Sequence, residues 1–540
     1  MALSPTAHVD TFCRTNLPPV ESWPELIFDG PDLQYPDRLN CATALLDDVI
    51  AKHGGDQPCL LAPGEETWSY QQLLDTSNRI AALLTTELGI VPGNRVLLRG
   101  PNNPWLVACW FGILKAGAVV VATMPMLRSG ELRSIHSVAK INLTLCDRRF
   151  LEDLEAAALE GAPTIAFGGA GDSDLSSRIS SQPGTYVDVA TAADDVALLA
   201  FTSGTTGRPK ATMHFHRDVL TIADTFSKHL LKPTADDVFA GTPPLAFTFG
   251  LGGAVIFPLR VGASTLLIEK ATPVELAGHI AENDVSVCFT APTAYRAMIV
   301  AGCASKLGSL RRAVSAGEHL DAVTWSAFFE ATGVKIIDGI GATEMLHVFI
   351  SAADDDIRPG STGRAVPGYQ ARIIDFAGQT VPDGTPGRLA VQGPTGCRYL
   401  ADERQSVYVE NGWNVTGDTF IRDEDGYFWY QARSDDMIVS SGYNIAGPEV
   451  EEAVQSYGDV LECAVVGLPD EARGSLVTAF IVLRDGVSGD EATALAIKQH
   501  VKATIAPYKY PRQIHFVSEL PRTQTGKLQR FRLRLDASTS

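Results

Sequence analysis

Short apolar runs alternate with segments of helical periodicity over most of this chain. The runs are rich in Val, Leu and Ile and cover residues 94–100, 116–124, 195–201, 264–270, 284–292 and 334–341. Strands that are buried on both faces give continuous apolar runs, and helices between the strands allow them to pair in parallel. The pattern therefore predicts an α/β fold with parallel sheets covered by helices on both faces.

The pattern changes near residue 435. Gly447-Pro448 predicts a helix start, because proline fits the first helical position and acidic residues follow it. Residues 461–469 and 476–484 predict two strands, residues 497–505 one helical face, and residues 513–521 a last strand. We therefore expect a large N-terminal α/β body of several subdomains, residues 1–434, and a small mobile α+β C-terminal domain, residues 435–540.

One uncharged segment, residues 238–259, is long enough to cross a membrane. It contains Pro243, Pro244 and Pro258, which would break the helix that insertion requires. The segment is therefore interpreted as buried loop and strand around a ligand pocket. The first residues lack a basic stretch followed by an apolar one, so we expect a cytoplasmic protein without a secretory signal or membrane association.

Length, charge and cysteine content narrow the possible classes. A chain of 540 residues predicts at least two domains. The net charge of −19 argues against a general nucleic-acid binder, so an anionic ligand would need local Lys or Arg side chains. Nine scattered cysteines without a CxxC pair predict free thiols and no zinc site. The oligomeric state stays open between monomer and homodimer.

A loop rich in Gly, Ser and Thr follows the apolar run at residues 195–201. Its sequence, "FTSGTTGRPK", spans residues 201–210. Glycines let the backbone curl around an anion, to which N–H and O–H groups donate. The spacing differs from the GxxxxGK[ST] phosphate loop. The expected phosphate-binding residues are Thr202, Ser203, Gly204, Thr205, Thr206 and Lys210.

This loop resembles the signature of the adenylate-forming superfamily, which includes acyl-CoA synthetases, the adenylation domains of peptide synthetases, and luciferases. Ala211 departs from the glycine that many members have there. The resemblance extends over essentially the whole chain, because the family's other motifs follow in order. It implies that a carboxylate attacks the α-phosphate of ATP with Mg²⁺ present, and that a thiol then displaces AMP.

The resemblance assigns roles to "DGIGATEML", residues 338–346. Thr343 would meet the α-phosphate and Glu344 would hold Mg²⁺, which suits a hard cation that bridges phosphate oxygens. Ile340 stands where the family usually has an aromatic residue. Gly317 and Glu318 in "SAGEHL" would contact adenine, and Asp338 and Gly339 are further expected nucleotide-binding residues.

Three later motifs complete the nucleotide site by the same resemblance. Asp418 would accept hydrogen bonds from the ribose hydroxyls, and Arg433 would also contact ribose. Asp435 matches the hinge about which the C-terminal domain turns. Lys527 matches the catalytic lysine of that domain, which would draw the carboxylate and the α-phosphate together.

The acid pocket is expected in residues 243–253 and 340–349. Its expected substrate-binding residues are Phe247, Phe249, Gly252, Ile340, Gly341 and His347. Residues 247–249 offer no carboxylate to hold an ammonium group, and Gly252, Gly253 and Gly341 would leave room for a flat ring. His347 is as well explained as a core histidine as by a substrate contact.

These two segments, with "DRLNCA" and "GNRVLLRGPNNP", resemble the benzoate and 2-aminobenzoate–CoA ligase branch. The resemblance favours 2-aminobenzoate, with benzoate and hydroxybenzoates open, and coenzyme A as the thiol. Gly442 and Tyr443 would border the pantetheine, and Arg473 and Tyr508 the CoA nucleotide. The alternatives are a stand-alone adenylation enzyme that loads a carrier protein, and an inactive nucleotide sensor. The retained catalytic motifs argue against the sensor.

Overall fold

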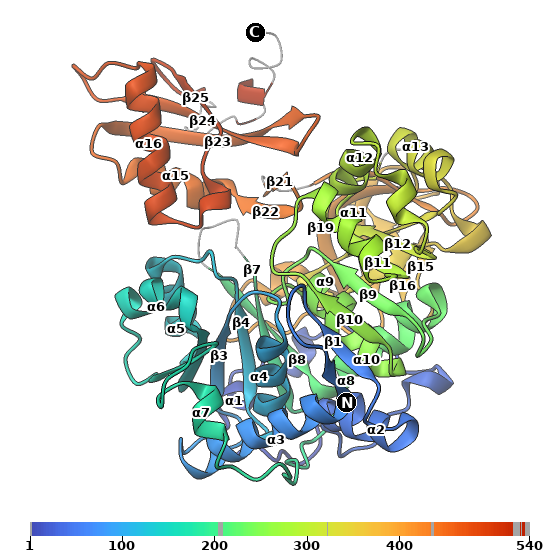
Figure 1. The fold of residues 1–540 in the computed structure, drawn as a ribbon. Helices are drawn as coiled ribbons and strands as arrows, with labels where there is room; N and C mark the ends of the chain where they lie inside the picture. Colours follow the sequence, from blue (N-terminus) through green and yellow to red (C-terminus); the bar gives the residue numbers. More distant parts are fainter. Residues whose placement is uncertain are drawn as a thin grey trace.

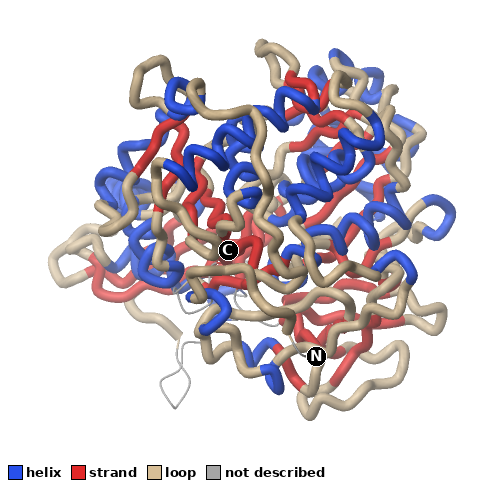
Figure 2. Tube along the Cα trace, turned by 90° about the horizontal axis from the view of Figure 1, so that it is seen from below, coloured by secondary structure: helices blue, strands red, loops and turns tan. Residues whose placement is uncertain are grey.

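A computed structural model describes residues 3–202, 209–320, 322–433, 437–521, 530 and 532–534. Two large sheets with helices on both sides form the N-terminal body, and a smaller unit follows it (Figures 1 and 2). All nine cysteines are buried and free, as the sequence predicted. Within the described ranges, no helix has the length and apolar character needed to cross a membrane.

The first sheet has six strands in the order β6-β5-β3-β4-β7-β8. All of its pairs are parallel except β7 with β8. The predicted runs at residues 94–100, 116–124 and 195–201 form its centre. The strands are β3 (Arg95–Arg99), β4 (Val119–Thr123), β5 (Leu143–Asp147), β6 (Thr164–Phe167), β7 (Val196–Thr202) and β8 (Lys210–Phe215).

The second sheet has nine strands in the order β15-β14-β13-β12-β11-β9-β10-β1-β2. Pairing is parallel from β1 to β13 and antiparallel at the two edges. The strands are β1 (Pro58–Leu61), β2 (Trp68–Ser69), β9 (Val238–Gly241), β10 (Ser264–Leu267), β11 (Val287–Thr290), β12 (Arg312–Ala316), β13 (Ile336–Gly341), β14 (Val348–Ser351) and β15 (Arg364–Ala365).

Helices with local start signals cover these sheets. α3 begins with a capping box formed by Ser69 and Gln72. α4 begins at Pro104 after Asn103, whose side chain accepts from the Leu106 N–H. The principal helices of the body are α2 (Asp48–His53), α3 (Tyr70–Thr86), α4 (Pro104–Lys115), α5 (Ser129–Ala139), α6 (Leu151–Ala157), α7 (Leu175–Ile179), α8 (His216–Ile222), η5 (Ala223–Leu231), α11 (Pro273–Glu282), α12 (Pro292–Val300), α13 (Ala322–Thr332) and α14 (Gln405–Tyr408).

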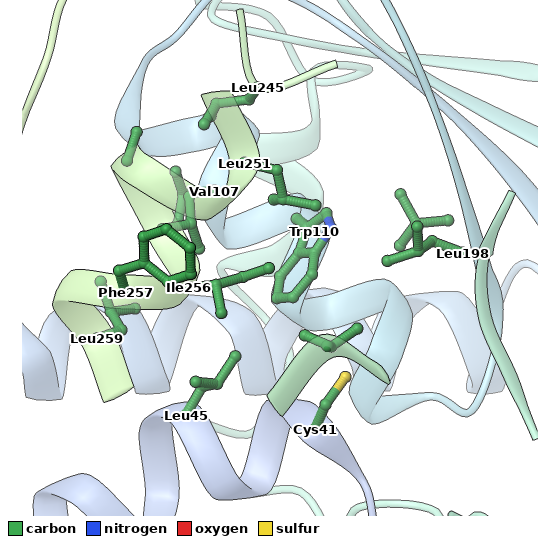
Figure 3. Close-up of a cluster of buried hydrophobic side chains, with 14 of the residues drawn as sticks. Cys41, Leu45, Val107, Trp110, Leu198, Leu245, Leu251, Ile256, Phe257 and Leu259 are labelled. Atoms are coloured by element: carbon green, nitrogen blue, oxygen red, sulfur yellow. The ribbon is translucent and has the colours of Figure 1, made fainter. Parts of the chain in front are cut away.

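One continuous helix lies in the core that both sheets share. It consists of α9 (Thr248–Leu251), the π-helical stretch η6 (Gly252–Ile256) and α10 (Phe257–Val261). Its Leu251 and Ile256 lie near Val107 and Trp110 of α4 (Figure 3). The interpretation of residues 238–259 as loop and strand was therefore wrong after residue 247. Pro258 lies inside this continuous helix, directly after the π-helical stretch, where the regular α-helical hydrogen bonding is already interrupted.

A five-stranded antiparallel sheet completes the body. The sequence prediction of parallel sheets did not anticipate it. Its longest strand, β19, mixes buried and half-buried positions and polar and apolar residues, so it lacks the continuous apolar run of the central strands. The strands are β16 (Gln370–Ile374), β17 (Gly387–Gln392), β18 (Val409–Glu410), β19 (Trp413–Arg422) and β20 (Phe428–Arg433).

The C-terminal unit has the predicted order of helix, strand, strand, helix and strand. A hairpin that was not predicted, β21 (Met437–Ser440) with β22 (Tyr443–Ala446), precedes it. The later elements are α15 (Gly447–Gln455), β23 (Val460–Asp470), β24 (Gly474–Leu483), α16 (Glu491–Thr504) and β25 (Gln513–Phe516). They enclose their own apolar core (Figure 1, orange to red). The expected boundary between residues 434 and 435 lies outside the described residues.

In the part of the chain that the structure describes, polar contacts at Glu131 and at Arg296 join this unit to the body. Lys509 is 4% exposed and lies between two carboxylates, with Nζ 2.5 Å from Glu131 Oε1 and 2.6 Å from Glu449 Oε1. Glu131 belongs to α5 of the body and also accepts from the Ala506 N–H at 3.0 Å. Arg296 of α12 donates to the Glu471 carbonyl at 2.9 Å. Both contacts fix the C-terminal unit above the body.

A buried ion pair stabilises the body beside β8. Arg398 and Asp218 are fully buried and paired with each other, and the Arg398 guanidinium lies 4.0 Å from the centre of the Phe215 ring. Burial raises the pKa of Asp218, and the charge of Arg398 opposes this. Each charge therefore depends on its partner for compensation.

We expect Asp218→Asn to lower the free energy of unfolding by about 3–5 kcal/mol, because it leaves the Arg398 charge buried without a counter-ion. Urea denaturation of the full chain measures this change. Asp32→Asn is the control: it breaks the surface pair Lys228–Asp32, whose side chains are 52% and 32% exposed, and should change little. Equal effects of the two variants would contradict the prediction.

Candidate active site

The phosphate-loop motif lies between two paired strands. β7 ends at Thr202 and β8 begins at Lys210, and these two residues are partners in the antiparallel register. Among the described residues, the buried Thr202 Oγ1 has no hydrogen-bond partner. Lys210 Nζ donates to the Tyr399 hydroxyl at 3.2 Å. The hairpin therefore fixes both ends of the loop and leaves a hydroxyl there for a ligand. Ser203, Gly204, Thr205 and Thr206 lie outside the described residues.

The Thr343–Glu344 motif forms a short turn, η8 (Thr343–Met345), after β13. His214 Nε2 lies 2.8 Å from the Thr343 carbonyl. Burial lowers the pKa of His214 to about 3, so the ring is neutral and Nε2–H donates to this carbonyl. Glu344 is 8% exposed, and its Oε1 accepts from the Tyr399 hydroxyl. Sequence reasoning missed both His214 and Tyr399.

Two groups of expected nucleotide-binding residues come together on neighbouring strands. Ser315 of β12 pairs with Asp338 of β13, and its hydroxyl donates to Asp338 Oδ1 at 2.7 Å. Gly317 follows β12 with φ +88°, a conformation that favours glycine. Burial raises the pKa of the neighbouring Glu318. Gly339 pairs with Ala316, so these expected nucleotide-binding residues lie together at the carboxyl ends of two adjacent strands.

The expected ribose-binding residues lie on the antiparallel sheet. Asp418 of β19 is 8% exposed and pairs in register with Arg433 of β20. Of Arg433, only the backbone is described. Tyr430 of β20 stacks on His319, with ring centres 5.5 Å apart. This contact joins the antiparallel sheet, which the sequence did not predict, to the expected adenine-contacting segment at residues 315–320.

His347, an expected substrate-binding residue, is 2% exposed. Four phenylalanine rings lie around it, with ring centres 4.6–6.4 Å away: Phe226, Phe249, Phe257 and Phe289. Burial lowers the pKa of His347 to about 3, so the imidazole is neutral. Neither ring nitrogen has a hydrogen-bond partner within the described part of the chain. Ile340 and Gly341 lie at the end of β13, next in the chain to the Thr343–Glu344 turn.

The role expected for the pocket glycines needs a correction. A Cβ at Gly252 would lie 2.5 Å from His347 Cδ2, and one at Gly253 would lie 2.6 Å from Phe289 Cγ. A Cβ at Gly341 would lie 2.7 Å from the His347 carbonyl oxygen. The space beside Gly252 and Gly253 is therefore occupied by the rings of His347 and Phe289, and not by a substrate ring.

The C-terminal unit reaches this site through its first hairpin. Gly442 lies at the tip with φ +79°, and its carbonyl oxygen is 3.7 Å from a Cβ built on Gly317. Tyr443 contacts the Phe247 ring at 6.3 Å and stacks on Tyr508 at 4.3 Å between ring centres. Phe247, which was expected in the acid pocket, therefore contacts the C-terminal unit.

The remaining predicted site residues are placed as follows. The Arg473 carbonyl accepts from the Ser441 N–H at 2.9 Å, beside the hairpin tip. The expected hinge Asp435 and the expected catalytic Lys527 lie outside the described residues. Over the described ranges, no group of three or more His, Cys, Asp or Glu side chains could hold a metal ion. The single buried carboxylate of Glu344 suits Mg²⁺, which is usually bound by one or two carboxylates together with substrate phosphates.

A hairpin that carries the phosphate-loop motif, beside a carboxylate turn and a C-terminal unit, is the arrangement expected of an adenylate-forming enzyme. Residues 46–399 match the family model described as AMP-binding enzyme, and residues 449–527 match the AMP-binding enzyme C-terminal domain. The chain therefore belongs to the AMP-binding enzyme family. It is an AMP-forming acid–thiol ligase, a class that uses ATP, Mg²⁺ and CoA.

Similar proteins include aryl-CoA ligases. The chain is 34% identical to the benzoate–CoA ligase of Thauera aromatica, over 93% of this chain and 97% of that protein. It is 34% identical to the anthranilate CoA ligase AuaEII, solved in complex with anthranoyl-AMP, with a TM-score of 0.73 over 94% of this chain and 99% of that one. A benzoate CoA ligase structure from Burkholderia xenovorans LB400 is 30% identical, with a TM-score of 0.68 over 92% and 100%.

Burial raises the pKa of Asp338 from 3.8 to about 7, while Ser315 and the Gly339 N–H oppose the shift. Between pH 3.8 and about 7, the unfolded state releases the proton of this carboxyl while the folded state keeps it. The carboxyl therefore stabilises the fold less as pH rises through this range. We expect Asp338→Asn to raise the melting temperature relative to the unchanged protein at pH 8 and to change it little at pH 4. A difference that does not depend on pH would contradict this prediction.

Proposed function

We propose that this aryl-CoA ligase activates 2-aminobenzoate, with benzoate as the next best acid. The acid reacts with ATP to give an acyl-adenylate and pyrophosphate, and coenzyme A then displaces AMP. The observation that carries the proposal is the ring of phenylalanines around a buried, neutral His347. Apolar surroundings with one polar group suit a flat aromatic acid.

The neutral state of His347 favours an uncharged ring substituent. A neutral imidazole offers one donor and one acceptor nitrogen. The aromatic amine of 2-aminobenzoate is uncharged at neutral pH and can donate to the acceptor nitrogen. Benzoate lacks this group and would leave the buried nitrogen without a partner, which costs binding free energy. The likeness to a solved anthranilate CoA ligase supports the same choice.

The site residues keep the roles that the resemblance gave them, as proposals. Thr343 would donate its hydroxyl to the α-phosphate, and Glu344 would hold Mg²⁺, which neutralises phosphate charge when bound. Lys527 would draw the acid's carboxylate toward the phosphate. Asp418 and Arg433 would hold the ribose.

The described position of the C-terminal unit supports a division between the two half-reactions. Its Gly442 and Tyr443 lie at the site, beside Gly317 and Phe247. We propose that this arrangement serves thiol transfer, with Arg473 and Tyr508 toward the CoA nucleotide. Rotation about Asp435 would then bring Lys527 into the site for adenylation.

Pyrophosphate release across a panel of substituted benzoates and fatty acids, with and without CoA, tests the proposed activity. We expect 2-aminobenzoate to give the highest kcat/KM and CoA to yield the thioester. Preference for fatty acids would overturn the aryl assignment. Adenylate formation without any CoA thioester would favour the alternative of a carrier protein as acceptor.

A variant of His347 tests the substrate preference. We expect His347→Phe to lower the ratio of kcat/KM for 2-aminobenzoate over benzoate by about 5- to 10-fold, the worth of one hydrogen bond. His216→Phe is the matched control, because His216 is also fully buried but lies beside Cys41. An unchanged ratio in His347→Phe would show that the amine is recognised elsewhere.

A further inference from the structure

Tyr399 connects two charged residues of the candidate active site. Its hydroxyl donates to Glu344 Oε1 and accepts from Lys210 Nζ at 3.2 Å. Lys210 Nζ also lies 5.0 Å from the centre of the Tyr399 ring. The phenol therefore stands between the carboxylate expected to hold Mg²⁺ and the lysine of the phosphate loop.

The fold fixes this phenol from several directions. The Met213 N–H donates to the Arg398 carbonyl at 2.8 Å, and the Leu400 N–H to the Ala211 carbonyl at 2.9 Å, so the segment pairs with β8. The Tyr399 N–H donates to Gln405 Oε1 at 2.8 Å. The side chain is fully buried, and its ring lies edge-on to Tyr408. Tyr399 therefore has little freedom to follow a moving partner.

The two partners of the hydroxyl decide the directions of its hydrogen bonds. A carboxylate only accepts hydrogen bonds, and an ammonium group only donates them. A neutral phenol has one proton to donate and lone pairs to accept. The proton goes to Glu344 and a lone pair faces Lys210, so the contact between the two charges runs through the hydroxyl.

We propose that Tyr399 is a positioning residue that orients Glu344 and keeps Lys210 from forming a direct ion pair with it. Opposite charges attract strongly in a buried site, and a direct pair would occupy the carboxylate that Mg²⁺ requires. With the hydroxyl interposed, Glu344 keeps a free oxygen for the metal and Lys210 keeps its charge for phosphate. The inference rests on the proposed role of Glu344.

Titration calorimetry of ATP binding to the full chain, with Mg²⁺ or with EDTA, tests this role without catalysis. We expect Tyr399→Phe to weaken ATP binding about 10- to 100-fold in Mg²⁺, as loss of a residue supporting a metal ligand does, and to change it little in EDTA. Tyr70→Phe is the matched control, because the Tyr70 hydroxyl is equally buried and donates to the Ala263 carbonyl at 2.7 Å. We expect that variant to keep the full Mg²⁺ effect.

An undiminished Mg²⁺ effect in Tyr399→Phe would overturn the inference. Glu344→Gln distinguishes a failure of this inference from a failure of the proposed metal role of Glu344. If Glu344→Gln loses the Mg²⁺ effect and Tyr399→Phe keeps it, only the inference fails. If both keep it, the proposed metal role of Glu344 fails as well.

Lys210→Met provides a second test, which can still be made if Tyr399→Phe does not fold. Tyr399 still holds Glu344 in this variant, so we expect ATP to bind more weakly in both buffers while the ratio between Mg²⁺ and EDTA is kept. A loss of that ratio as large as in Glu344→Gln would mean that Lys210 itself orients the carboxylate. That result would also overturn the inference.

Discussion

Backbone pairing around β8 holds the candidate site together. On one side β8 pairs with β7, which fixes both ends of the phosphate loop at Thr202 and Lys210. On the other side it pairs with residues 398–400, which lie nearly two hundred residues away in sequence. From the same strand, His214 holds the Thr343 carbonyl. One strand therefore sets the relative positions of the phosphate loop, the carboxylate turn and Tyr399.

Three polar side chains of this site, His214, His347 and Tyr399, are buried and neutral, although the protein carries a net charge of −19. Burial lowers the pKa of His214 and His347 and raises that of Tyr399. Neutral groups can orient a ligand without adding to the charge that an anionic substrate meets. Positive charge is instead placed at particular positions, as at Lys210, which suits a protein whose overall field repels anions.

The sequence was informative where structure depends on local pattern. Apolar runs predicted β3, β4 and β7, and the Gly447-Pro448 signal predicted α15. Helix α9–η6–α10 was missed because its glycines and Pro258 are typical of loops, and its stability comes from packing against α4. Tyr399 and His214 escaped detection because each acts through a residue more than fifty positions away in sequence. The family motifs gave a candidate nucleotide site, whereas the surroundings of His347 required tertiary contacts.

The π-helical stretch Gly252–Ile256 decides which side chains share a face. Phe249 and Phe257 both contact His347 and Phe289, although eight residues of regular α-helix make about 2.2 turns and would offset them by about 80°. The wider π-helical turn brings eight residues closer to two full turns. The phase of a single helix thus aligns two phenyl rings, so a one-residue change in its length would reshape the pocket without altering any residue that lines it.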